Sequence, residues 1–249
     1  METGEIPFGE KKPDWTLTMS AEEERTREPQ YQFQLTHDAN HGRAALGLMT
    51  NAAWHQDPRR LLFLLSRYKF VAKMLSGKSS VLEVGCGDAF GTRMVLQSVG
   101  TICAIDFDPI FVRDVNERMD QQWKFECKVH DILDGPLTGP FDAAYSLDVM
   151  EHIPSSQEGK FLSHITQSLA ADGVLIIGMP SLESQVYGHP ASKEGHVNCK
   201  DEAAFRNLML RYFANVFIFS MNDEVVHTGF YPMAHYLFAL CVSPRANQP

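Results

Sequence analysis

The distribution of apolar residues along the chain changes near residue 80. From there on, short unbroken apolar runs alternate with longer segments in which apolar residues recur every three or four positions. The short runs indicate buried strands, and the longer segments indicate amphipathic helices. The expected strands are 80–85, 101–106, 124–130, 141–147, 173–179, 215–221 and 235–242, and the expected helices are 91–99, 109–119, 155–170 and 200–213.

Strands that alternate with helices in this way predict an α/β fold. Because each strand is a continuous apolar run, we expect a mostly parallel sheet that helices cover on both faces. No helical segment separates the last two strands, at 215–221 and 235–242. One strand near the C-terminus is therefore expected to run antiparallel to its neighbours.

The pattern before residue 80 predicts three parts of different character. Residues 1–30 contain eight acidic residues and few large apolar ones, which is typical of a flexible tail. Residues 31–56 hold aromatic residues without clear periodicity, and we interpret them as a short-helical lid. A helix with one apolar face begins near Pro58, so the lid and this helix together span 31–77, and 78–249 form the main domain.

Composition narrows the class of protein further. The chain has 249 residues with 44% hydrophobic and 21% charged residues, so one large domain can bury an adequate core. A net charge of −9 argues against nucleic acid as a partner. The five cysteines form no CxxC pair, which disfavours a structural zinc site or a disulfide framework. Without a signal peptide or a long apolar segment, the expectation is a cytoplasmic protein with no membrane partner.

The strongest chemical signal is a glycine-rich turn between an expected strand and an expected helix. The sequence there reads VLEVGCGDAFG at 81–91, with Gly85 and Gly87 in the turn. Glycine lets a ligand approach the backbone closely. Asp106 ends the next expected strand, 19 residues after Gly87, where an acid can accept hydrogen bonds from ribose hydroxyls. A ligand that contains a nucleoside is therefore expected at this edge of the sheet.

The details of this turn disfavour a dinucleotide. The glycine spacing is GxGxxxG rather than GxGxxG, and Glu83 and Asp88 place acids in and beside the turn. Carboxylates repel a pyrophosphate but suit a cationic group. S-adenosylmethionine carries a sulfonium and an ammonium and has no phosphate. A nucleotide-dependent oxidoreductase is thus the less favoured alternative.

At this point the sequence resembles the class I S-adenosylmethionine-dependent methyltransferases. The segment 81–91 resembles their first motif, IDFDP at 105–109 their second, and FDAAYSLDVMEHI at 141–153 their fourth. The resemblance covers residues 78–180 and implies a Rossmann-like doubly wound sheet. It also implies S-adenosylmethionine as the cofactor.

The same resemblance implies where the cofactor binds. Glu83 and the turn Gly85-Cys86-Gly87 would contact its methionine part, and Asp106 would hold the ribose. The adenine would lie against Phe107, framed by two residues after the third strand, while one residue after the fourth strand would lie beside the sulfonium. These last residues are Asp131, Ile132 and Leu147.

Residues for the methyl acceptor are expected at the same sheet edge and in the polar loop 181–198. A hydroxyl acceptor must lose its proton to a base, and His152 and His196 are the candidates. The prediction includes no metal. An alternative is that Asp148, Glu151 and His152, with His189 or His196, bind a divalent ion, as in some related methyltransferases that carry an acid-xx-Glu-His segment.

These observations predict methyl transfer to a hydroxyl or amino group of a small-molecule acceptor, such as a sugar or a natural-product-like metabolite. Two alternatives remain open, namely a methyltransferase that acts on RNA or protein and a non-catalytic S-adenosylmethionine-binding protein. No nucleic-acid partner is expected, and the oligomeric state stays open.

Overall fold

The computed structural model describes residues 25–188 and 190–246. The chain divides into two compact units between Ala44 and Ala45. In the first unit, the 3-10 helix η1 (Pro29–Tyr31) precedes helix α1 (Gln32–His41), and neither contains a buried residue. Most of the tail expected at 1–30 lies outside the described residues.

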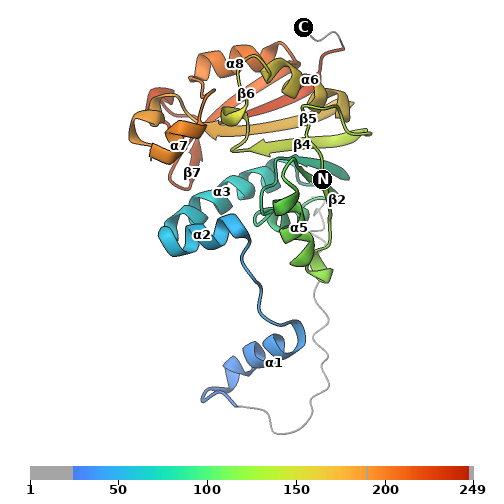
Figure 1. Cartoon of the computed structure of the whole chain (residues 1–249), viewed down its shortest axis with the longest axis vertical. Helices are drawn as coiled ribbons and strands as arrows, with labels where there is room; N and C mark the ends of the chain where they lie inside the picture. The colour runs from blue at the N-terminus through green and yellow to red at the C-terminus, as the bar shows by residue number, and fades with distance from the viewer. Residues whose placement is uncertain (1–24, 189, 247–249) are drawn as a thin grey trace, which may run out of the picture. The chain divides into compact units, whose positions relative to one another are not determined.

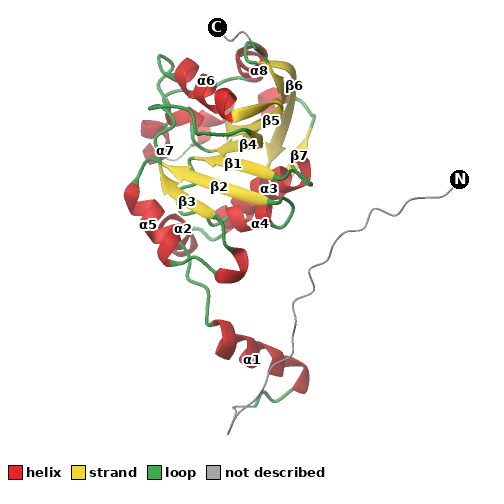
Figure 2. Ribbon diagram, turned by 90° about the vertical axis from the view of Figure 1, so that its right-hand side faces the viewer, coloured by secondary structure: helices red, strands yellow, loops and turns green. Residues whose placement is uncertain are grey.

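The second unit is built on a sheet of eight strands in the order β3-β2-β1-β4-β5-β8-β6-β7 (Figure 1, Figure 2). The strands are β1 (Ser80–Val84), β2 (Thr101–Asp106), β3 (Glu126–Val129), β4 (Phe141–Leu147), β5 (Leu169–Pro180), β6 (Phe213–Asn222), β7 (Val225–His227) and β8 (Tyr236–Pro244).

The strand directions confirm the predicted doubly wound sheet. Strands β1 to β5 pair in parallel, and β8 lies between β5 and β6 and runs antiparallel to both. Strand β7 was not expected from the sequence. It pairs antiparallel with β6 and has three residues, which is too short to produce an alternating pattern.

Helices cover both faces of this sheet, as Figure 2 shows. Helices α3 (Arg59–Met74), α4 (Thr92–Leu96) and α5 (Pro109–Glu117) cover one face, and α6 (Glu158–Ser168) and α8 (Glu202–Leu210) cover the other. Alternation along β1 explains the two cores, since Val81 packs with α3 and α4 whereas Leu82 packs with α6 and α8.

Several boundaries differ from the sequence-based expectation. The helix expected to run to residue 170 ends at Ser168, because Leu169 already pairs with Phe141 as the first residue of β5. The helix expected to begin at residue 200 begins at Glu202, where Asp201 accepts the capping hydrogen bond from the N–H of Ala204 at 2.7 Å. The side chain of Asn198 donates to Glu158 at 3.0 Å.

The segment expected to form a lid contains helix α2 (Leu48–Gln56) within the second unit. The loop after β5 contains η4 (Glu183–Tyr187) and α7 (Pro190–Gly195), and the connection after β4 contains η3 (Met150–His152). Two further 3-10 helices are η2 (Gln121–Trp123) and η5 (Tyr231–Met233). Among the described residues, no helix is both long enough and apolar enough to span a bilayer.

Candidate functional site

Backbone hydrogen bonds from the adjacent strand hold the glycine-rich turn after β1 in place. The N–H groups of Gly85 and Cys86 both donate to the carbonyl of Ile105 in β2, at 2.8 and 3.0 Å. The N–H of Gly87 donates to Oδ2 of Asp106 at 2.9 Å. Both glycines have positive φ angles, 75° and 52°, where a side chain introduces strain. The turn and the acid that ends β2 therefore meet at one edge of the sheet.

Asp106 keeps acceptor capacity after these contacts. Its Oδ1 accepts the N–H of Asp108 at 2.9 Å, so each carboxylate oxygen has one backbone donor and one further acceptor site. Phe107 follows it and is 70% exposed. The chain after β3 lies beside this edge, because the N–H of His130 donates to the carbonyl of Asp106 at 2.9 Å.

The residues after β3 are fixed by local contacts. Asp131 accepts the N–H of Leu133 at 2.8 Å. Ile132 is buried, and its carbonyl lies 2.6 Å from Nδ1 of His164 in α6. Asp131 and Ile132 directly follow His130, whose N–H bonds to Asp106, so they belong to the connection that leaves the sheet beside the end of β2.

Glu83 is buried inside β1 and is held by two hydroxyl groups. Tyr68 of α3 donates to one carboxylate oxygen at 2.9 Å, and Thr92 of α4 donates to the other at 2.6 Å. Burial raises the pKa of Glu83 to about 7, although these hydrogen bonds favour the ionised form. Glu83 therefore ties two helices to the strand that carries the glycine-rich turn.

Asp88 is engaged by helix α2. One of its oxygens, Oδ2, accepts both the backbone N–H of Thr50 at 2.7 Å and the Thr50 hydroxyl at 2.8 Å. The N–H of Leu48 donates to Asp114 at 3.3 Å, and Arg118 bridges Asp114 and the carbonyl of Asp88. These contacts fasten the start of α2 to the glycine-rich turn.

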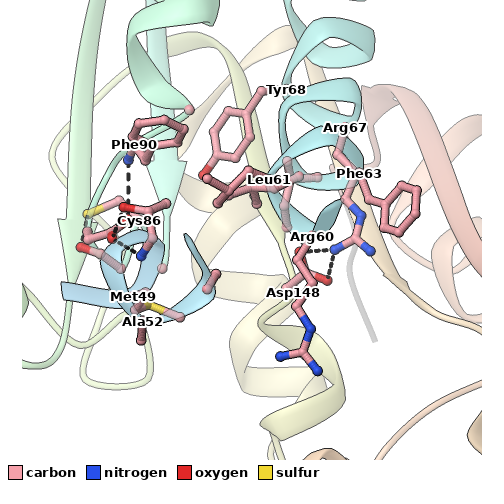
Figure 3. Close-up of a pocket in the computed structure, with 18 of the residues that line it drawn as sticks. Met49, Ala52, Arg60, Leu61, Phe63, Arg67, Tyr68, Cys86, Phe90 and Asp148 are labelled. Atoms are coloured by element: carbon pink, nitrogen blue, oxygen red, sulfur yellow. Dashed lines mark hydrogen bonds and ion pairs between the residues drawn. The ribbon is translucent and has the colours of Figure 1, made fainter. Parts of the chain in front are cut away.

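A cavity of about 630 Å³ lies between α2, α3, this turn and the end of β4 (Figure 3). Of the residues expected at the site, six line the cavity, namely Gly85, Cys86, Gly87, Leu147, His152 and His196. The other five do not line it in the described structure: Glu83, Asp106, Phe107, Asp131 and Ile132. Their part in cofactor binding stays a prediction.

A partly buried ion pair lies in the cavity wall, as Figure 3 shows. Nη1 of Arg67 in α3 lies 2.7 and 2.6 Å from the two carboxylate oxygens of Asp148. The guanidinium also lies 4.0 Å from the ring centre of Tyr236. Asp148 adopts a positive φ of 57°, and its N–H donates to the carbonyl of Gly178 at 3.0 Å.

Glu151, His152 and His196 form a cluster at the same cavity. Nδ1 of His152 lies 2.8 Å from the carbonyl of Gly195, and Nδ1 of His196 lies 2.8 Å from Oε1 of Gln185. The two imidazole rings are 5.1 Å apart. Burial, followed by the neighbouring Asp148, raises the pKa of Glu151, whereas burial and His152 lower the pKa of His196.

The structure separates residues that the sequence analysis grouped together. Asp148 belongs to the ion pair with Arg67, while Glu151, His152 and His196 lie together. His189 lies outside the described residues. Among the polar side chains of the cavity wall, Thr50, Gln56 and Arg60 were not singled out from the sequence. Nothing in the spacing of these residues distinguishes them from ordinary polar positions of a helix.

The order of the elements, a glycine-rich turn after β1 and an acid at the end of β2, defines a nucleoside-binding doubly wound fold. Residues 81–173 match a family model described as a methyltransferase domain. The chain thus contains a methyltransferase domain with the Rossmann-like fold and motifs of the class I S-adenosylmethionine-dependent methyltransferases. No curated protein matches the chain by sequence.

Solved structures share this fold. The chain is similar to the N-methyltransferase NodS from Bradyrhizobium japonicum WM9, with a TM-score of 0.56 and 17% identity, over 76% of this chain and 99% of that one. The methyltransferase domain of a bacterial Hen1 gives a TM-score of 0.59 at 13% identity, over 72% and 99%. DhpI, solved with SAH, gives 0.57 at 14% identity, over 80% and 92%.

Proposed function

We propose that this protein transfers the methyl group of S-adenosylmethionine to a hydroxyl or amino group of a small-molecule acceptor. One observation carries the proposal. A single cavity is lined by the glycine-rich turn and by the His152–His196 pair. Its volume of about 630 Å³ lies within the range of about 300–1,000 Å³ that is usual for small-molecule sites.

The residues at the turn suit the chemistry of this cofactor. The carboxylate of Asp106 has acceptor sites for two ribose hydroxyls. Phe107 offers an exposed ring for the adenine. The turn itself presents backbone and carboxylate groups, which suit an ammonium and a sulfonium. Leu147 provides the apolar wall beside the reacting centre.

S-adenosylmethionine supplies an electrophilic methyl group on a sulfonium, so the protein must position the acceptor and remove its proton. His152 is suited to that task. Its Nδ1 faces a backbone carbonyl, which can only accept a hydrogen bond, so the proton lies on Nδ1 and Nε2 keeps its lone pair. The lowered pKa of His196 keeps the second ring neutral.

A small acceptor fits the charge of the cavity better than RNA does. Among the described residues that line it, Arg60 and Arg67 are the lysine or arginine side chains, and Asp148 neutralises Arg67. Binding an RNA backbone requires several basic groups along a surface. The net charge of −9 also disfavours binding of RNA. Helix α2, which Asp88 holds against the turn, serves as the lid over the small acceptor.

Calorimetric titration tests the cofactor, and labelled methyl transfer tests the acceptor. We expect S-adenosylmethionine and S-adenosylhomocysteine to bind and NAD not to bind. Methyl label is then expected in a pool of small metabolites and not in total RNA or protein. Binding of NAD alone, or label in RNA alone, would contradict the proposal.

Replacement of His152 tests the proton transfer. In a His152→Ala variant, kcat is expected to fall by about 100-fold or more while cofactor affinity is kept. His55→Ala is the matched control, because His55 is exposed on α2 and does not line the cavity. Unchanged turnover of His152→Ala would remove this residue from the mechanism.

A further inference from the structure

Helices α2 and α3 each present one face to the cavity. The residues on these faces are Met49, Ala52, Ala53 and Gln56 of α2, and Arg60, Phe63, Leu64, Arg67 and Tyr68 of α3 (Figure 3). Within each helix they are separated by three, four, seven or eight positions, which places them on one side of the helix. The order of the residues along these two faces therefore describes what a ligand in the cavity meets.

One end of each face lies against the glycine-rich turn. A Cβ on Gly87 would lie 2.8 Å from Sδ of Met49, and a Cβ on Gly91 would overlap the ring of Tyr68. The chain runs away from the turn along α2 and returns to it along α3. Gln56 is seven residues from Met49, and Arg60 is eight from Tyr68, which corresponds to about 10–12 Å along each helix. Gln56 and Arg60 thus mark the end of the two faces away from the turn.

The two faces share the same order of polarity. Their middle positions are apolar, namely Ala52, Ala53, Phe63 and Leu64. Gln56 and Arg60 follow on either side of the corner that joins the helices, and both are exposed. A ligand that extends from the turn to this corner meets apolar side chains first and then an amide and a guanidinium.

Arg60 has no carboxylate partner, although an acid lies three residues before it. Arg59 takes both carboxylate oxygens of Asp57, at 2.8 and 3.1 Å, and the charge of Arg60 acts on Asp57 only at longer range. Within residues 25–188 and 190–246, Arg60 forms no ion pair and its side chain makes no hydrogen bond. Since Arg60 lines the cavity and Arg59 does not, the guanidinium without a partner is the one that a ligand can reach.

The acids of the cavity wall do not neutralise Arg60 either. Asp148 is paired with Arg67, and Asp88 accepts two hydrogen bonds from α2 beside the glycine-rich turn. Burial raises the pKa of Glu151, which favours its uncharged form. The cavity therefore has an uncompensated cation at the corner between α2 and α3.

We infer that the methyl acceptor carries a carboxylate, which Arg60 and Gln56 bind, and that an apolar part joins this carboxylate to the group that is methylated. The inference rests on the proposed methyl transfer. A guanidinium presents two N–H groups in the geometry that a carboxylate accepts, and the amide of Gln56 can donate a further hydrogen bond. One cation balances one carboxylate, whereas a phosphate monoester carries about two charges.

The distance from the turn makes the acceptor, and not the cofactor, the source of this carboxylate. S-adenosylmethionine also has a carboxylate, but its methionine part is expected at Gly85 and Gly87, at the other end of the two helical faces. Leu147 and His152, which are expected beside the reacting centre, line the same cavity. An acceptor that reaches from there to Arg60 has to cross the apolar middle of these faces.

Binding of octanoate and octanamide to the full chain tests the carboxylate site without turnover. The two probes share an apolar tail and differ in charge, and calorimetry measures their affinities with and without S-adenosylhomocysteine. We expect octanoate to bind about tenfold more tightly than octanamide or better. Arg60→Met should remove this preference and Gln56→Leu should reduce it. Arg59→Met is the matched control and should keep it, because Arg59 lies on the same helix but does not line the cavity.

Equal affinities for the two probes, no binding of either, or the same preference in Arg60→Met and the wild type would overturn the inference. Circular dichroism checks that each variant is folded. The affinity for S-adenosylmethionine should be the same in Arg60→Met and the wild type. A tenfold loss would assign Arg60 to the cofactor and would also overturn the inference.

The products of labelled methyl transfer to a metabolite pool provide a second test. They should form amides with a carbodiimide and a primary amine, as carboxylic acids do, and products without a carboxyl group alone would contradict the inference. Absence of any labelled small molecule would contradict the proposed function instead. In that case, a preference for octanoate that depends on Arg60 would still support the carboxylate site.

Discussion

Arg67 and Asp148 lie 81 residues apart in the chain, yet one guanidinium nitrogen, Nη1, contacts both carboxylate oxygens of Asp148 at 2.7 and 2.6 Å. Arg67 lies on α3, before the sheet begins, and Asp148 directly follows β4 in the middle of the sheet. The pair therefore joins α3 to the edge of the sheet where the glycine-rich turn lies.

Replacing Arg67 should destabilise the fold. Arg67→Met leaves the partly buried carboxylate of Asp148 without its donor, and the free energy of unfolding should fall by about 1.5–3 kcal/mol. Urea unfolding measures the change. Arg59→Met is the matched control, because Arg59 pairs with Asp57 at the surface and such pairs contribute little. Equal effects of the two substitutions would show that burial of the Arg67 pair does not matter.

Removing the Thr50 hydroxyl should loosen helix α2. Thr50→Val keeps the shape of the side chain but deletes the donor to Asp88, 2.8 Å away. A hydrogen bond to a carboxylate contributes about 1.5–3 kcal/mol, so amide hydrogen exchange in α2 should accelerate by about tenfold or more. Exchange in α8 serves as the internal reference. Unaltered exchange in α2 would mean that the hydroxyl adds nothing to the backbone hydrogen bond that Thr50 also donates to Asp88.

Glu83 should make the protein less stable as the pH rises through the weakly acidic range. The folded protein keeps the proton on Glu83 up to its pKa of about 7, whereas an exposed glutamate releases it near 4.5. Between these values the folded state binds more protons than the unfolded state. Stability should therefore decline from pH 4.5 to 7, by about 3 kcal/mol from this group.

Denaturant titrations at several pH values, with Glu83→Gln as the comparison, measure this contribution. The amide is isosteric with the carboxyl group and carries no charge at any pH, so the variant should lose this part of the slope. The cost in the wild type should be absent below pH 4.5 and complete above pH 7. A wild type and a variant with parallel stability profiles would assign the slope to other groups.

The glycines of the turn should be required for cofactor binding. Gly85 has a φ of +75°, and a Cβ there would collide with the side chain of Val149. Gly85→Ala should lower both stability and affinity for S-adenosylmethionine, the latter by more than about tenfold, because backbone strain of about 1–2 kcal/mol shifts the turn. Gly77→Ala is matched in φ, at +84°, but has no atom nearby. It should lower stability alone, as calorimetry and thermal unfolding can show.

The pattern of the sequence predicted the sheet well because its elements are local. Strands such as β1 and β4 are short apolar runs between helices, and both appear where the pattern places them. The glycine-rich turn and Asp106 were also found, since strand order in a doubly wound sheet brings them to one edge. Strand β7 was missed because three residues are too few to show alternation.

The residues that line the cavity could not all be predicted from the sequence, because contacts between distant segments bring them together. The sequence placed His152 and His196 in two separate segments. Backbone hydrogen bonds from Val197 and Asn198 to Glu151, and the contact of His152 with the carbonyl of Gly195, bring them together. The motif does not distinguish Asp148 from Glu151, but in the folded chain Asp148 forms an ion pair with Arg67. As a result, Oε2 of the buried Glu151 has no hydrogen-bond partner among the described residues. This carboxylate lies near the imidazoles of His152 and His196.

The sequence alone thus determined the methyltransferase fold and the glycine-rich turn at the edge of its sheet, because both follow from periodicity and from motifs within a few neighbouring residues. The tertiary structure decided which partner each acidic side chain binds. Glu83 holds Tyr68 and Thr92, Asp88 holds Thr50, and Asp148 holds Arg67. The partners of a carboxylate depend on which distant side chains packing brings within about 3 Å, and hydrogen bonds act only at that range.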